Sequence, residues 1–133
     1  MISLNVSFRI LGGGEEIGAN SYLLRIGDEN IVLDCGLHPR KKGMEMFPDY
    51  ENIKNESIRH LIVSHAHNDH IGALPYFLKL FPYAKVHTTK PTLAIAEVTL
   101  MNTSTIIQKE FLGTWDKTAL EYYTEETLNL IPM

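Results

Sequence analysis

The sequence predicts an α/β fold, formed as one domain or as part of one. Short runs of alternating apolar and polar residues, typical of β-strands, fill the first half, and longer segments with helical spacing follow. The chain has 133 residues, of which 44% are hydrophobic and 21% are charged, as in ordinary globular proteins. A chain of this length can bury one substantial core.

Three strands are expected near the start, over residues 6–11, 22–26 and 31–33, because each run is apolar or alternating and is bounded by turn residues. Residues 27–30 have the composition of a hairpin turn, so the second and third strands are expected to be antiparallel. Residues 36–57 are rich in Pro, Gly, Lys and Asn, and we expect a long excursion with little regular structure. Loops of that length inside a domain are often functional.

The remaining elements are expected in the order strand, helix, strand, helix and helix, over residues 60–64, 71–81, 84–88, 91–107 and 124–130. The fourth strand is apolar enough to be buried on both faces. Pro75 fits the first turn of the first helix, and Thr124 fits an N-cap. Because the last helix ends with neither cap nor tail, we expect the chain to be part of a longer protein.

Charge and cysteine content exclude several classes of protein. The net charge of −4 and the pI near 5.8 give no overall basic field for nucleic acid or an anionic membrane, although a local groove can still be basic. Cys35 is the one cysteine, so an internal disulfide and a Cys-rich zinc module are excluded, and we expect a small buried residue there. The sequence shows no signal peptide and no spanning segment, which predicts a soluble, cytoplasmic protein without a membrane partner.

A cluster of metal-ligand residue types follows the fourth strand, in the segment His65-Ala66-His67-Asn68-Asp69-His70. Alternate side chains of an extended segment share a face, so His65, His67 and Asp69 are expected to converge. His70, at the start of the helix, is expected to point elsewhere and to meet Asp69 at a second metal. Zinc accepts such imidazole and carboxylate ligands, and catalytic sites keep one position open for water. The alternative is a polar loop of surface histidines.

Asp34 follows the third strand and is expected at the same edge of the sheet as the histidines. A carboxylate there can accept the second ring N–H of a metal-binding histidine and fix its orientation. The alternative is an Asp that caps the turn at Cys35-Gly36, and both roles can hold together. The glycines at 12–14 are expected to form a turn that places Glu15 and Asn20 near the site.

Several other side chains have two interpretations. The run Arg40-Lys41-Lys42 in the long loop could contact a phosphate backbone, with His38 shaping that loop, or the basic run could be solvated surface. His60 and His87 are expected to be structural residues of the sheet.

These residues resemble a known family. The pattern His65-x-His67-x-Asp69-His70 is similar to the signature of the metallo-β-lactamase fold, and Leu33-Asp34-Cys35-Gly36 resembles its first motif. Further segments resemble the β-CASP branch, which includes RNase J and the endonuclease of the cleavage-and-polyadenylation specificity factor. They are residues 11–20, 34–39, 70–75, 88–92 and 123–126, so the likeness extends over essentially all of residues 1–133.

The resemblance implies a four-layer αββα sandwich with two zinc ions at the sheet edges. His65 and His67 would bind one zinc, and Asp69 and His70 the other. A bridging hydroxide would attack a phosphodiester phosphorus, and Asp69 would orient it or receive its proton. The family also needs a further histidine, a bridging aspartate and later β-CASP motifs, and we find no counterpart after His70. We therefore expect residues 1–133 to be the N-terminal part of one metallo-β-lactamase domain, holding half of a site and little activity alone.

RNA cleavage is the leading functional interpretation, with RNA as the partner of the parent protein. One alternative is a hydrolase of the same fold that acts on a small thioester, lactone or phosphoester. Another alternative is a non-catalytic interaction module, in which apolar surface exposed by truncation drives homo-oligomer formation.

Overall fold

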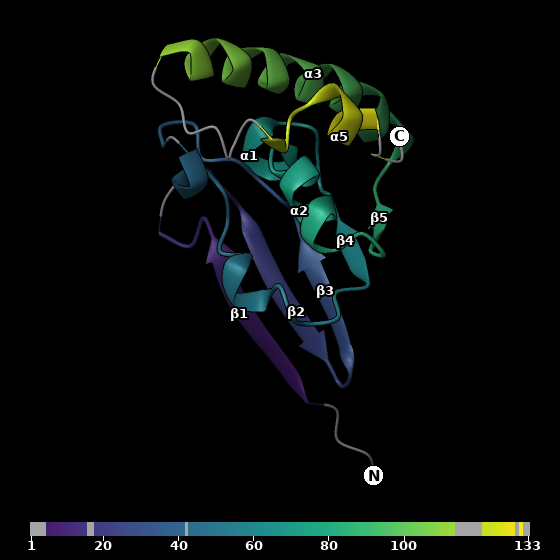
Figure 1. Ribbon diagram of the computed structural model, residues 1–133. Helices are drawn as coiled ribbons and strands as arrows, with labels where there is room; N and C mark the ends of the chain where they lie inside the picture. Colours follow the sequence, from purple (N-terminus) through teal and green to yellow (C-terminus); the bar gives the residue numbers. More distant parts are fainter. Residues whose placement is uncertain (1–4, 16–17, 42, 114–120, 130, 132–133) are drawn as a thin grey trace.

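A five-stranded mixed sheet with helices on one side organises the chain (Figure 1). The computed structural model describes residues 5–15, 18–41, 43–113, 121–129 and 131. The sheet has the order β1-β2-β3-β4-β5, formed by Val6–Gly12, Ser21–Ile26, Glu29–Leu33, His60–Ile62 and Lys85–His87. β1, β2 and β3 pair antiparallel, whereas β3, β4 and β5 pair parallel. The predicted α/β class is confirmed.

The hairpin predicted between the second and third strands is present. Ile26 pairs with Glu29, so two residues form the turn, and Gly27 has φ of 59°. Primed hairpin turns need a positive φ at the first turn position, which glycine adopts without steric cost.

The parallel strands bring the functional segments to one edge of the sheet. β3 and β4 pair from Ile31 with His60 to Leu33 with Ile62, so both strands end at the same edge. Asp34 follows β3 directly, and its main-chain N–H donates to the Ile62 carbonyl at 2.8 Å. The segment after β4 leads into the histidine motif at this edge, as the sequence predicts.

The helices differ from expectation mainly at their ends. The structure has α1 (Asn68–Ile71), α2 (Leu74–Leu80), α3 (Lys90–Gly113), α5 (Glu125–Asn129) and two 3-10 helices, η1 (Gly43–Met46) and η2 (Glu51–Ile53). The prediction of one helix over 71–81 is therefore wrong, because α1 ends at Ile71 and a separate helix begins at Leu74. Pro75 lies in the first turn of α2, and Thr124 accepts from the Thr127 N–H at 3.3 Å, as predicted.

No helix in the described ranges is long and apolar enough to cross a bilayer. The cytoplasmic location stays a prediction.

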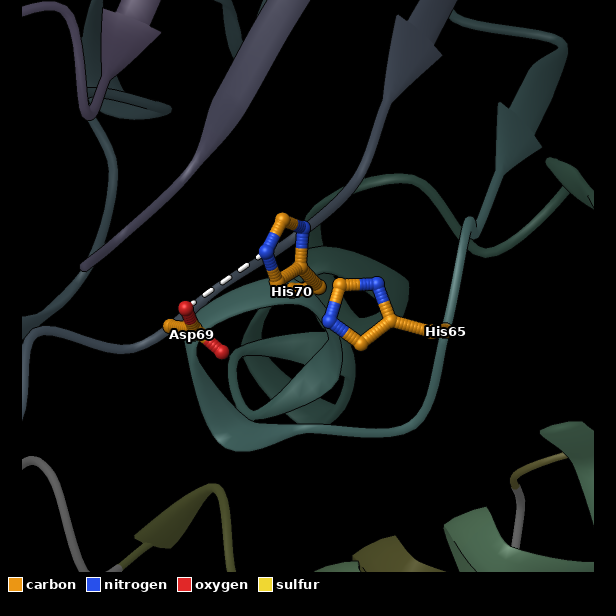
Figure 2. Close-up of side chains that lie close together, drawn as sticks. All are labelled: His65, Asp69 and His70. Atoms are coloured by element: carbon orange, nitrogen blue, oxygen red, sulfur yellow. Dashed lines mark ion pairs between the residues drawn. The ribbon is translucent and has the colours of Figure 1, made fainter. Parts of the chain in front are cut away.

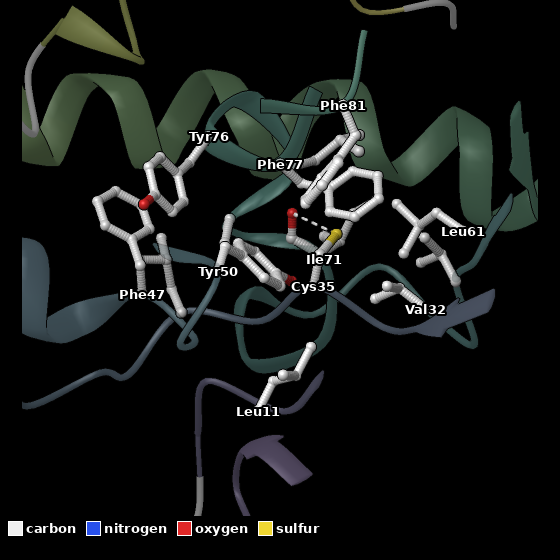
Figure 3. Packing of buried hydrophobic residues seen from close by; sticks show 14 of the residues in the cluster. Leu11, Val32, Cys35, Phe47, Tyr50, Leu61, Ile71, Tyr76, Phe77 and Phe81 are labelled. Atoms are coloured by element: carbon white, nitrogen blue, oxygen red, sulfur yellow. Dashed lines mark hydrogen bonds between the residues drawn. The ribbon is translucent and has the colours of Figure 1, made fainter. Parts of the chain in front are cut away.

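The core lies between the sheet and the helices. The strand residues Val32 and Leu61 pack in one cluster with Phe77 of α2 and Tyr50 of the long excursion (Figure 3). All four side chains are fully buried. Cys35 is buried in the same cluster, as predicted, and burial with the neighbouring Asp34 charge raises the pKa of its thiol well above the usual range. Cys35 is therefore a packing residue in its neutral form.

The long excursion has little regular structure, as predicted, because η1 and η2 contain only four and three residues, but it packs closely against the core. Its η1 and η2 turns insert Met46, Tyr50 and Ile53 into the core. The Tyr50 hydroxyl meets Ser21 Oγ at 2.8 Å, and Ser21 Oγ donates to the Asp34 carbonyl at 2.8 Å. The excursion thus braces the strand end that carries Asp34.

The opposite face of the sheet is apolar and open in the described part of the chain. Its exposed residues are Val6 (63%), Phe8 (58%), Ile10 (55%) and Ile62 (44%). The prediction that the fourth strand is buried on both faces is therefore wrong, because the described helices cover one face only. The described residues form one helical layer and one sheet, and the second half of the predicted sandwich is not among them.

Candidate metal centre

The metal-ligand motif spans the turn between β4 and α1. His67 has an extended conformation, with φ of −75° and ψ of 149°, and precedes the first helical residue. The His70 and Ile71 N–H groups donate to the His67 carbonyl at 2.9 Å. Asp69 therefore sits in the first turn of a helix, where the partial positive charge of the helix N-terminus favours a carboxylate. The prediction that the segment is extended as far as Asp69 is wrong, because α1 begins at Asn68.

Three side chains of the motif converge (Figure 2). His65, Asp69 and His70 each offer a ligand atom, and these atoms lie within 4.8 Å of one another. Nε2 of His70 is 3.4 Å from Oδ2 of Asp69, and the centroids of the His65 and His70 rings are 3.8 Å apart. His70 thus meets Asp69 as predicted, but it also faces His65 instead of pointing elsewhere.

His67 lies beside this group rather than in it. Its side chain is exposed, and its ring meets the His65 ring edge-on, with centroids 4.9 Å apart. The predicted convergence of His65, His67 and Asp69 is therefore not what the structure shows. Because the helix starts at Asn68, Asp69 rotates away from the face that His67 shares with the extended segment.

Asp34 orients the His70 ring through a hydrogen bond to Nδ1, the nitrogen on the side away from Asp69. Its carboxylate accepts from His70 Nδ1 at 2.8 Å, from the Ser64 N–H at 2.7 Å and from the Ser64 hydroxyl at 2.8 Å. A carboxylate only accepts, so Nδ1 of His70 carries the proton and Nε2 keeps its lone pair toward Asp69. Asp34 also has φ of 60°, a left-handed conformation that Asp tolerates better than most residues.

Ser64 extends this support to the second imidazole. Its single hydroxyl proton goes to Asp34, so the oxygen acts as acceptor toward His65 Nδ1 at 3.2 Å. Nε2 of His65 is then left as the ring's lone-pair nitrogen. Sequence reasoning missed Ser64, although a hydroxyl directly before a histidine motif at a strand end is a detectable signal.

The backbone around the motif is closely interlocked. Cys35 N–H donates to the His70 carbonyl at 2.9 Å, and the Asn20 side-chain amide donates to the Asp69 carbonyl at 2.8 Å. The expected approach of Asn20 to the site is confirmed, while Glu15 is exposed. A Cβ at Gly36 would lie 1.9 Å from the Asp69 carbonyl oxygen, so only glycine permits this approach.

A cavity of about 370 Å³ adjoins the group on the side of Asp69. Its walls come from the loop Leu37–Lys41, from Asn68 and Asp69, and from Thr103, Ile106 and Ile107 of α3. The Thr103 hydroxyl donates to the Asn68 side-chain oxygen at 2.6 Å, which fastens α3 to α1. The predicted loop residues His38, Arg40 and Lys41 therefore line a cavity that reaches the candidate metal ligands.

A family model described as the metallo-beta-lactamase superfamily matches residues 14–110. The chain belongs to the metallo-β-lactamase superfamily. The matched segment contains both Asp34 and the whole histidine motif, so the predicted fold family is confirmed.

The chain is similar to subunits of two complexes, named the Integrator complex and the cleavage and polyadenylation specificity factor. Integrator complex subunit 11 of Danio rerio is 38% identical over 96 residues, which are 68% of this chain and 16% of that protein. Cleavage and polyadenylation specificity factor subunit 3-I of Arabidopsis thaliana is 37% identical over 91 residues, 68% of this chain and 13% of that protein.

The likeness includes a third such protein. Cleavage and polyadenylation specificity factor 73 of Drosophila melanogaster is 44% identical over 68 residues, 51% of this chain and 10% of that protein. These proteins belong to the β-CASP branch, so the predicted resemblance to that branch is confirmed. The chain spans at most 16% of the length of these relatives.

Proposed function

We propose that this chain contributes to the active site of a metal-dependent hydrolase that cleaves RNA phosphodiester bonds. The observation that carries the proposal is the convergence of His65, Asp69 and His70, with Asp34 holding His70. Membership of the metallo-β-lactamase superfamily and the names of the relatives support it.

The donor set fits zinc. Two imidazoles and one carboxylate are the ligand types that zinc accepts in catalytic sites, and the three ligand atoms already lie within 4.8 Å of one another. We assign His65, His67, Asp69 and His70 as zinc ligands, with His67 reaching the metal by turning its exposed side chain. When bound, zinc supplies Lewis acidity and lowers the pKa of water to about 7.

We further propose that residues 1–133 supply the N-terminal part of one metallo-β-lactamase domain. His65, Asp69 and His70 form the one such group among the described residues, and even with His67 the four ligands are fewer than two zinc ions need. The remaining ligands would come from another part of the protein.

The chain's own residues have distinct tasks in this proposal. Asp34 keeps the proton on Nδ1 of His70, so that Nε2 stays available as a ligand. Asp69 has a half-buried carboxylate at the mouth of the cavity and is the group that orients the attacking water and receives its proton. General bases of this kind contribute about 10²–10⁴-fold to the rate.

The cavity beside Asp69 is the proposed substrate groove. Arg40 and Lys41 are exposed cations on its wall, and His38 shapes the loop by accepting the Arg40 N–H at 3.1 Å. Arg and Lys are the usual partners of backbone phosphates. The apolar wall from Ile106 and Ile107 offers a surface for a base or ribose.

End-labelled single-stranded RNA tests this function. The protein from the full open reading frame is incubated with the RNA and zinc, beside His67→Ala and the matched control His87→Ala. Zinc-dependent cleavage that is lost in His67→Ala and kept in His87→Ala is expected. Residues 1–133 alone should cleave little, so full activity from this segment would contradict the proposal that it holds half of a site.

Two other functions rest on specific observations. The cavity of about 370 Å³ is large enough for a small ligand, so a zinc-loaded protein that hydrolyses a thioester, lactone or phosphoester and leaves RNA intact would favour a small-molecule hydrolase. The exposed Val6, Phe8 and Ile10 on β1 would favour an interaction module or homo-oligomer. Light scattering tests the latter, and a strictly monomeric chain would count against it.

A further inference from the structure

Asn20 directly precedes β2 and lies against the segment that carries the candidate metal ligands. Its main-chain N–H and its side-chain Nδ2 both donate to the Asp69 carbonyl, at 3.2 Å and 2.8 Å. Its own carbonyl accepts from the Gly36 N–H at 2.9 Å. These hydrogen bonds tie the turn between β1 and β2 to the two segments that follow β3 and β4.

The orientation of the Asn20 amide is fixed by its partners. A main-chain carbonyl only accepts hydrogen bonds, so the atom that faces the Asp69 carbonyl must be the NH₂ nitrogen. The amide oxygen lies on the side of Gly13, where a Cβ would be 2.2 Å from Oδ1. Gly13 also has φ of 79°, a conformation that favours glycine. The glycine at position 13 thus makes room for the amide in this orientation.

The same amide nitrogen faces the imidazole of His70. Nδ2 of Asn20 lies 3.5 Å from Nε2 of His70, the nitrogen that keeps its lone pair. An NH₂ group has two hydrogens, and the Asp69 carbonyl takes one of them. A proton on Nε2 would meet a second donor there, so the amide favours the lone pair on this nitrogen. Asp34 and Asn20 therefore act on opposite nitrogens of one ring and favour the same tautomer.

We propose that Asn20 is a positioning residue of the metal centre, which holds Asp69 in place and keeps Nε2 of His70 available to the metal. This role rests on the zinc site proposed for His65, Asp69 and His70. The Asp69 carbonyl belongs to the helical turn that directs the Asp69 carboxylate, so displacement of this carbonyl moves the carboxylate relative to His70. Groups that orient metal ligands typically contribute about 10–100-fold to metal affinity.

Zinc affinity of the whole chain, measured by competition with a chromophoric chelator, tests this role. Asn20→Ala should bind zinc about 10-fold more weakly than wild type, because it loses the side-chain hydrogen bond to Asp69 and the donor beside His70. Asn30→Ala is the matched control, since the Asn30 side chain also donates to a main-chain carbonyl, that of Ser57 at 3.2 Å. The control should stay within about threefold of wild type.

Gly13→Ala gives an independent test, because it displaces the Asn20 amide without removing it. The new Cβ meets Oδ1 of Asn20 at 2.2 Å, so zinc affinity should fall by a similar factor. In the double variant Gly13→Ala with Asn20→Ala that clash is absent, and zinc should bind about as well as to Asn20→Ala alone. The free energy of unfolding should behave differently, because alanine at φ of 79° is strained in either background. A general loss of structure would instead make the two losses of zinc affinity add.

Nitrogen-15 NMR of the metal-free chain supplies a readout that does not depend on zinc. The Nε2 signal of His70 should move in Asn20→Ala and stay in place in Asn30→Ala. Three results overturn the role of Asn20: an unmoved signal, additive losses with Gly13→Ala, or zinc affinity within about threefold of wild type in folded Asn20→Ala. Each leaves the zinc proposal standing, because the wild-type chain still binds zinc. If the wild-type chain binds none, the zinc proposal fails as well, and the role of Asn20 is overturned with it.

Discussion

Replacing Asp34 by Asn isolates the contribution of its charge to the candidate metal centre. The left-handed φ of 60° at this position is well tolerated by Asn, so the backbone is expected to stay in place. The Asn side chain keeps one acceptor oxygen for the Ser64 N–H, but it presents an NH₂ group to donors on the other side. His70 Nδ1–H then loses its acceptor at 2.8 Å, and only the Ser64 hydroxyl oxygen remains nearby, at 3.5 Å.

The imidazole can restore its hydrogen bond with residue 34 only by moving its proton to Nε2, the nitrogen that faces Asp69. A hydrogen bond to a charged group contributes about 1.5–3 kcal/mol, and removal of such a support lowers metal affinity about 10–100-fold. The two magnitudes agree, because a 10–100-fold change equals about 1.4–2.7 kcal/mol. We therefore expect Asp34→Asn to weaken zinc binding by that factor.

The measurement is zinc affinity by competition with a chromophoric chelator. Asp49→Asn is the matched control, because it removes the same charge from an exposed residue whose carboxylate lies 3.7 Å from Arg9 and accepts from Asn52 at 2.7 Å. The control should bind zinc within about threefold of wild type. Equal affinities for Asp34→Asn and wild type, in a folded protein, would refute the role given to Asp34.

Three further changes test the packing and electrostatics of the fold. Tyr123→Phe removes a buried hydroxyl that donates to a main-chain carbonyl between α1 and α2, and should cost about 1–3 kcal/mol in urea unfolding; an unchanged midpoint would contradict this. Gly36→Ala places a Cβ 1.9 Å from the Asp69 carbonyl oxygen and should cost at least about 2 kcal/mol, measured in the same way. The Glu51 pKa is lowered, chiefly by hydrogen bonding to Lys54, so NMR titration should show it rising in Lys54→Gln.

The pH dependence of the Glu51–Lys54 ion pair follows from the direction in which the Glu51 pKa is shifted. Because the folded-state pKa of Glu51 lies below its usual value, the ion pair with Lys54 stabilises the fold above that usual value and is lost as the pH falls through the folded-state pKa. Glu51 is exposed, so the effect on stability is small.

Much of the sheet follows from local signals. β1, β2 and β3 carry alternating residues, and Gly27 marks the hairpin, so their existence and pairing are predictable. The break between α1 and α2 is not, because Gly72 and Ala73 are compatible with one continuous helix. Tertiary contacts decide it: the Ala73 N–H donates to the Cys35 carbonyl at 2.8 Å, outside the helical ladder.

The site was predictable in composition but not in geometry. The run from His65 to His70 contains the metal-ligand types, and the parallel strand ends bring Asp34 to the same edge. Which side chains meet depends on the residue at which the helix starts, and a shift of one or two positions rotates Asp69 relative to His67. Helix ends are the least certain feature of a sequence-based prediction.

Zinc-edge anomalous diffraction from crystals grown with zinc tests the central claim most directly, because it locates the metal itself. An anomalous peak is expected about 2.0–2.2 Å from Nε2 of His65, Nε2 of His70 and a carboxylate oxygen of Asp69, with the His67 ring turned toward the metal. Zinc bound fully elsewhere, with no peak between these three side chains, would contradict it.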